Sequence, residues 1–425
     1  MRTLREGSRG PAVQLLQLAL NRAGAGDLAL DGRFGPATRA ALTAFQEEMG
    51  LRPDGVAGAL SHRALMPWYT GYLTHRVQRG DSFWSVARRY GAKPEAVLAA
   101  NPALAPDSLP LGAELTVPLP FSVVPTQIDC FAELVGFCVQ GLAARYPALH
   151  SGSIGRSALG RPLRSLRMGR GANRVLYNAE HHANEWITTP VLLRFAEELG
   201  RAAAEGGTLL GTPAAEILDY ADIALIPAVN PDGMDLVTGE LREGRAWEEA
   251  RRMAERYPQF SFPRGWKANL RGIDLNLQYP ALWETARENK FALGIVSPAP
   301  GDYVGSAPLE APESRALYDY TREFDPALTL SLHTQGEVIY WKFLDLEVPG
   351  AEEIAALFSD LSGYAAEETP YASGFAGYKD WYIRQYRRPG FTLELGRGVN
   401  PLPTRDFEGI YERVRGILVL GALVT

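Results

Sequence analysis

The 425-residue sequence is poor in cysteine, with only Cys130 and Cys138. The two residues lie eight positions apart in a segment that we expect to be helical, so about 12 Å would separate them, which is too far for a disulfide. No disulfide framework therefore supports an extracellular location. A chain of this length does not need one to bury a core.

Long apolar runs and an excess of positive charge are also missing. No apolar run reaches the length of about 18 residues that a membrane helix needs, so we expect no membrane span. The formal net charge of -6 predicts no basic surface for nucleic acid. The first ten residues contain no apolar core, so we expect no signal peptide there. Export by another route, a leader outside this sequence and action inside the cell all stay open.

Histidine is scarce too, with six residues, and two of them stand at the ends of apolar runs. His182 follows the run at 175–177, and Glu185 comes three residues later, where a helical pattern begins. His333 follows a second strand-like run at 327–332. Because the active sites of open α/β sheets lie at the carboxyl ends of strands, we expect these three side chains to meet.

These residue types are the ligands of catalytic zinc, which takes three protein ligands and keeps one position for water. We therefore predict one Zn²⁺ ion held by His182, Glu185 and His333. His181 has poorer spacing than its neighbour, and we do not expect it to be a ligand. Glu394 ends a third strand-like run and is the predicted general base, because a carboxylate beside the attacking water usually serves amide hydrolysis.

The order of these fragments resembles the zinc carboxypeptidase family over residues 126–425. The family pattern is His-x-x-Glu-Trp, then Asp-x-Asn-Arg-Asn, then a distant His and a late Glu. This chain carries it at 182–186, at 274–278, at His333 and at Glu394. The resemblance implies the same zinc ligands and base. It also makes Asp274 the carboxylate that orients a ligand histidine.

Departures from the family pattern bear on the substrate. Leu277 stands where the family has an arginine that clamps a terminal carboxylate, and leucine cannot make that forked contact. Lys267 takes the place of the arginine that stabilises the oxyanion, and Arg271 is the alternative for this role. The segment 266–276 looks most like the bacterial γ-D-glutamyl-diamino acid endopeptidases of the family, which cut peptidoglycan stem peptides. That activity is our prediction. C-terminal trimming of peptides and a catalytically silent cell-wall-binding protein are the alternatives.

Three further residues, in addition to Arg271, are expected to contact the substrate. Asn276 belongs to the Asp-x-Asn segment. Tyr371 resembles the mobile tyrosine that caps the substrate, with a plain surface aromatic as the alternative. Lys379 falls near the specificity pocket of the family, where a cation would meet a carboxylate of a diamino acid, although a solvated loop charge is the commoner reading.

Two small modules precede this region. Residues 1–68 combine helical apolar patterns with two similar Asp-Gly loops, at 31–35 and 54–58. They resemble the three-helix peptidoglycan-binding domain, and a plain helical packing domain is the alternative. Residues 72–119 resemble a LysM domain, a βααβ module that binds N-acetylglucosamine glycans. We expect Trp84 to pack in the core of this second module, with contact to the glycan as the alternative.

The expected fold is therefore α/β, with a carboxypeptidase-like mixed sheet flanked by helices over residues 126–425. A small three-helix domain and a βααβ domain precede it, and a proline-rich stretch at 118–125 is expected to be the linker. The predicted partners are the glycan and the stem peptide of peptidoglycan. The two modules favour the cell wall or another extracytoplasmic location.

Overall fold

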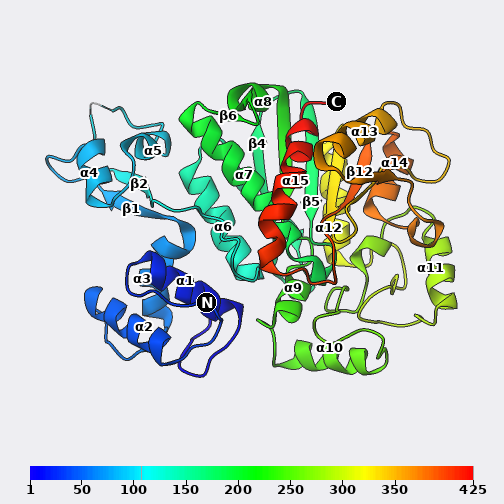
Figure 1. The fold of residues 1–425 in the computed structure, drawn as a ribbon, viewed down its shortest axis with the longest axis horizontal. Helices are drawn as coiled ribbons and strands as arrows, with labels where there is room; N and C mark the ends of the chain where they lie inside the picture. Colours follow the sequence, from blue (N-terminus) through cyan, green and yellow to red (C-terminus); the bar gives the residue numbers. More distant parts are fainter. Residues whose placement is uncertain (107, 425) are drawn as a thin grey trace.

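One mixed sheet of eight strands forms the centre of the C-terminal region in the computed structural model, which describes residues 1–106 and 108–424 (Figure 1). In sheet order the strands are β11 (Ala365–Glu367), β10 (Val338–Tyr340), β12 (Gly390–Glu394), β9 (Leu328–His333), β5 (Asn173–Ala179), β8 (Ala221–Ile226), β4 (Pro162–Gly169) and β3 (Leu149–Arg156). The predicted α/β class and mixed sheet are confirmed.

The four central strands, β12, β9, β5 and β8, run parallel. Their nearly continuous buried runs are typical of parallel strands that are covered on both faces. The register pairs Glu394 with His333 and Ala179 with Leu332. The carboxyl ends of β5, β9 and β12 therefore lie side by side at one edge of the sheet.

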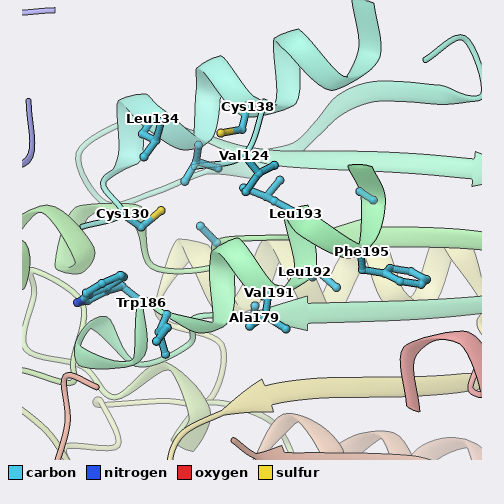
Figure 2. Close-up of a cluster of buried hydrophobic side chains, with 14 of the residues drawn as sticks. Val124, Cys130, Leu134, Cys138, Ala179, Trp186, Val191, Leu192, Leu193 and Phe195 are labelled. Atoms are coloured by element: carbon cyan, nitrogen blue, oxygen red, sulfur yellow. The ribbon is translucent and has the colours of Figure 1, made fainter. Parts of the chain in front are cut away.

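Helices pack on both faces of this sheet because successive strand residues point to opposite sides. Val175 and Tyr177 of β5 belong to the core beneath α6 (Ala132–Arg145), α7 (Thr188–Glu205), α13 (Ala351–Ser362) and α15 (Phe407–Leu420). Leu176 belongs to a second core beneath α12 (Pro312–Phe324) and α14 (Tyr378–Tyr386). Figure 2 shows part of the first core, where Leu134 and Leu193 lie between α6 and α7.

The remaining elements of this region are short. They are α8 (Ala214–Tyr220), α9 (Pro231–Thr238), α10 (Arg245–Glu255), α11 (Trp283–Ala292), a hairpin of β6 (Thr208–Leu209) and β7 (Thr212–Pro213), and the 3-10 turns η1 (Ala183–Glu185), η2 (Leu275–Leu277), η3 (Tyr371–Ser373) and η4 (Thr404–Asp406). None of the helices in the described residues is both long enough and apolar enough to cross a membrane.

The first module consists of α1 (Pro11–Arg22), α2 (Pro36–Glu48) and α3 (Ala59–Thr70). Two buried glutamines explain its repeated Asp-Gly loops. The Gln17 side chain donates to Asp31 (2.8 Å) and accepts from the backbone N–H of Gly32 (3.0 Å). Gln46 holds the second loop through Asp54 (3.1 Å) and Gly55 (2.9 Å) in the same way.

The second module has the expected βααβ order, with β1 (Tyr72–Arg76), α4 (Phe83–Arg89), α5 (Pro94–Ala99) and β2 (Glu114–Pro118). Ser82 caps α4, accepting from the backbone N–H of Ser85. The expectation that Trp84 packs in the core is wrong, because its side chain is 59% exposed. Phe83 takes the buried position instead, and the next residue of a helix points about 100° away from it.

The linker is packed against the rest of the protein. Glu197 of α7 is buried and accepts from the backbone N–H groups of Val123 (2.7 Å) and Val124 (3.0 Å). Arg22 of α1 donates to the carbonyl oxygens of Trp68 and Ser122, both at 2.9 Å. The first module, the linker and the C-terminal region are therefore joined by directed hydrogen bonds.

The two cysteines lie in this part of the first core (Figure 2). Both thiols are buried and free. The helix α6 begins at Ala132, so Cys130 precedes the helix that we expected to contain it.

Candidate metal centre and catalytic cleft

Three side chains from separate elements meet at the carboxyl edge of the sheet. His182 follows β5, Glu185 ends the turn η1, and His333 ends β9. One carboxylate bridges the two imidazoles, since the Glu185 oxygens lie 2.9 Å from Nδ1 of His182 and 2.9 Å from Nδ1 of His333. The ligand atoms of the three residues all lie within 4.8 Å of one another, so one ion can reach all of them.

Asp274 fixes the orientation of His182. Its Oδ1 atom lies 3.1 Å from Nε2 of His182 and accepts from the backbone N–H of Asn276, also at 3.1 Å. A carboxylate that takes the Nε2 proton leaves Nδ1 free to bind a metal. Two imidazole nitrogens and a carboxylate form a catalytic zinc ligand set, so the residues present fit this ion.

The charges around this centre support metal binding. Burial acts to raise the pKa of Glu185, but His182 and His333 outweigh it and hold the pKa well below its usual value. Burial and the nearby Lys267 act to lower the pKa of His182, but Glu185 and Asp274 outweigh them and raise it to about 9. In the metal-free protein Glu185 and Asp274 therefore keep His182 protonated. A metal ion that binds this imidazole would displace the proton.

A cleft opens beside the metal ligands, with Glu394 and Lys267 in its wall. Glu394 is the last residue of β12 and therefore lies next to His333. Burial, reinforced by the Glu185 carboxylate, raises the pKa of Glu394 to about 8. Burial acts to lower the pKa of Lys267, but Glu185 and Asp274 outweigh it and raise the pKa, so this residue stays cationic.

The structure brings Asn276 and Lys379 to the same cleft. Asn276 Oδ1 accepts from the backbone N–H of Tyr378 (3.0 Å), which fixes its amide. Lys379 is not the solvated loop charge that we considered commoner. It is buried, and its ammonium donates to Asp380 (2.6 Å) and to the carbonyl of Lys342 (2.7 Å). Its charge is thus already balanced.

Tyr371 and Arg271 lie outside the cleft wall. Tyr371 is 68% exposed in η3 and packs edge-on against Phe375, with 4.9 Å between ring centroids. Arg271 is exposed and lines a separate surface hollow with Arg252 and Arg256 of the α10 region. The alternative that Arg271 stabilises the oxyanion is therefore not supported by its position, because a cation must face the reacting carbonyl.

His181 takes a packing role. It is buried, its Nε2 lies 3.0 Å from the Tyr279 hydroxyl, and its ring stacks on that of His333 with 5.5 Å between centroids. Lys290 and Asp302 are among the cleft residues that sequence reasoning missed. Neither ends an apolar run, so the pattern that identified the metal ligands carried no signal for them.

Comparisons with known proteins agree with this geometry. The sequence model of the zinc carboxypeptidase family matches residues 138–414. Models of the peptidoglycan binding domain and the LysM domain match residues 9–65 and 75–118. A gamma-D-glutamyl-L-diamino acid endopeptidase of Lysinibacillus sphaericus is 42% identical over 283 residues, which are 67% of this chain and 69% of that protein.

Solved structures show the same fold at low identity. Carboxypeptidase A from Helicoverpa armigera aligns with a TM-score of 0.54 and 20% identity, covering 71% of this chain and 75% of that one. Bovine thrombin-activatable fibrinolysis inhibitor aligns with a TM-score of 0.53 and 18% identity, covering 70% and 97%. The family model matches more than half of this chain, and a His-Glu-His centre lies at the edge of the sheet. The chain therefore belongs to the zinc carboxypeptidase family of metallopeptidases.

Proposed function

We propose that this enzyme hydrolyses the bond between γ-D-glutamate and the diamino acid of peptidoglycan stem peptides. The identity of 42% to an endopeptidase of that name, over 67% of this chain, is the observation that carries the proposal. The two N-terminal modules support it, because both match cell-wall-binding families. They also support action at the cell wall.

Leu277 favours this substrate over an ordinary peptide C-terminus. It lines the cleft and stands at the position where the family pattern has an arginine. An apolar side chain cannot form the paired hydrogen bonds that hold a terminal carboxylate. The cleft would therefore bind its substrate through contacts other than a clamp of Leu277 on a terminal carboxylate.

Zinc, held by His182, Glu185 and His333, would polarise the scissile carbonyl and make water a stronger nucleophile. Glu394 accepts the proton of the attacking water and passes it to the leaving amine. Lys267 offers the cationic charge that the developing oxyanion needs, in a cleft where water is partly excluded. A bound dication would favour the Glu394 carboxylate and so oppose the rise of its pKa.

We assign supporting substrate contacts to Asn276, whose amide is fixed, and to the cleft wall around Lys379. Tyr371 is assigned the role of a cap. Its exposed position on the short turn η3 leaves room for the ring to move over the cleft, whose wall includes the neighbouring Ser373.

The proposal is tested by digesting the tetrapeptide L-Ala-γ-D-Glu-diaminopimelyl-D-Ala with the zinc-loaded full chain and identifying the products by mass spectrometry. We expect release of the dipeptide diaminopimelyl-D-Ala, and none with Glu394→Gln. A C-terminal dipeptide with an ordinary α-peptide bond serves as the comparison substrate. Faster cleavage of that dipeptide would overturn the specificity, and a zinc-loaded chain that cuts neither substrate would indicate a catalytically silent protein.

A further inference from the structure

An accessible ion pair lines the catalytic cleft, and the mechanism above does not use it. The Lys290 ammonium lies 2.6 Å from Oδ1 of Asp302, and both residues belong to the cleft wall. Their side chains are 14% and 35% exposed, whereas those of Lys379 and Asp380 in the same cleft are 5% and 4% exposed. The Lys290–Asp302 pair can therefore exchange its partner for a ligand, while the buried pair cannot do so without breaking the core.

The pair has a fixed position relative to the metal ligands. The backbone N–H of Asp302 donates to Oδ2 of Asp274 (3.1 Å), and the other oxygen of Asp274 holds His182. Asp302 also has a φ of 64°, in the left-handed region that residues with a side chain rarely adopt. Such strain persists only where the surroundings impose it, and it is concentrated at functional sites.

Stability gives little reason for this arrangement, because a partly exposed ion pair contributes little to folding. Binding of a charged ligand gives a better reason for the arrangement. An ammonium and a carboxylate held side by side match a ligand group that carries both charges on one carbon. Its carboxylate meets Lys290 and its ammonium meets Asp302.

The substrate under the proposed function offers one such group. Diaminopimelate carries a free amine and a free carboxylate together at its distal end. L-Lysine, the other common type of diamino acid, carries only the distal amine. The D-glutamyl residue, whose amine is acylated in the stem peptide, carries only a carboxylate.

We infer that Lys290 and Asp302 form the subsite that binds the distal ammonium and carboxylate of a diaminopimelate-type residue. The inference rests on the proposed function and adds the residues that select the diamino acid. Lys290 binds the distal carboxylate, which distinguishes diaminopimelate from lysine. Asp302 binds the distal ammonium, which both diamino acids carry.

Two tripeptides test the inference, L-Ala-γ-D-Glu-diaminopimelate and L-Ala-γ-D-Glu-L-Lys, with kcat/KM measured for each. Loss of a hydrogen bond to a charged group predicts that Lys290→Met lowers kcat/KM for the diaminopimelate peptide at least about tenfold. The lysine peptide should change less than about twofold, since it has no distal carboxylate to lose. Asp302→Asn should lower both values, because both peptides carry the distal ammonium.

Lys342→Met is the matched control. Lys342 forms a surface ion pair with Glu368 at the same 2.6 Å distance, and its side chain is not part of the cleft wall. This variant should keep the wild-type rates on both peptides. Zinc content is measured for every variant, and Lys290→Gln provides a second, more polar replacement should the methionine variant fold poorly.

The outcomes distinguish failure of the proposed function from failure of the subsite assignment. A wild-type enzyme that cuts neither tripeptide overturns the proposed function and the inference with it. When the wild type cuts both, unchanged rates in both Lys290 variants overturn the inference alone. An equal loss on both peptides also overturns it, because Lys290 would then bind a carboxylate that both peptides carry.

Discussion

Glu394 and His333 are partners in the sheet, paired at the carboxyl ends of the parallel strands β12 and β9. The predicted base and a predicted zinc ligand are thus held by two paired strands of the central sheet. Neither depends on a loop for its position. This relationship makes the roles of the two residues separable by mutation.

Replacement of Glu394 by Gln should abolish most activity and leave the metal in place. The amide has nearly the same shape but cannot accept the proton of the attacking water, so we expect a loss of at least about a hundredfold in rate. Zinc content measured by atomic spectrometry should stay at one ion per chain. A near-normal rate in this variant would remove Glu394 from its role.

Replacement of His333 by Ala should remove the metal as well as the activity. It deletes one of three protein ligands of the proposed zinc site. His181→Asn is the control, since His181 stacks on His333 but is not part of the ligand group. We expect the control to keep stoichiometric zinc, and equal zinc loss in both variants would show that His181 also binds the ion.

Asp274→Asn should weaken zinc binding without deleting a ligand. The amide cannot take the Nε2 proton of His182 as a carboxylate does, so the imidazole is less firmly oriented and less basic. We expect zinc affinity to fall about 10- to 100-fold. Competition with a chelating dye measures this, and an unchanged affinity would reduce Asp274 to a packing residue.

Zinc affinity should fall as the pH falls below about 9. The carboxylates of Glu185 and Asp274, against the effect of burial, raise the pKa of His182 to about 9 in the metal-free protein. Zinc binds only the neutral imidazole, so below this pH the ion has to displace a proton. One displaced proton predicts a decrease of about tenfold in affinity per pH unit. Titration calorimetry in buffers of different ionisation enthalpy should detect the released proton, and affinity independent of pH between 6 and 8 would contradict the assignment.

Glu197→Ala should loosen the linker. It would leave the buried N–H groups of Val123 and Val124 without their acceptor, at a cost of about 1–3 kcal/mol each. We expect a lower Tm and faster proteolysis within residues 118–125. Glu205→Ala, at the exposed end of the same helix, should leave both unchanged.

Much of the centre could be predicted because its residues stand at strand ends. The apolar runs before His182, His333 and Glu394 became β5, β9 and β12, and the helical pattern after Glu185 became part of α7. Parallel strands share one carboxyl edge, so a linear pattern was enough to place these side chains together. The helices and strands of the two N-terminal modules could be predicted as well, because their loops and caps are formed by residues close together in the sequence.

Other features depended on packing between distant segments. The burial of Lys379, the exposure of Trp84 and the position of Arg271 away from the cleft follow from which neighbours fill each space. The Lys290–Asp302 pair depends on the path of the segment after α11. Local sequence cannot encode such neighbours.

The sequence by itself therefore determined the strands, the residue types of the zinc centre and the edge of the sheet where they meet, because these follow from periodicity and strand direction. Only the tertiary structure decided which charges face the cleft and which are already neutralised. The reason is physical: the behaviour of a charged side chain depends on its burial and on the nearest opposite charge, and in this protein both are supplied by segments far away in the chain.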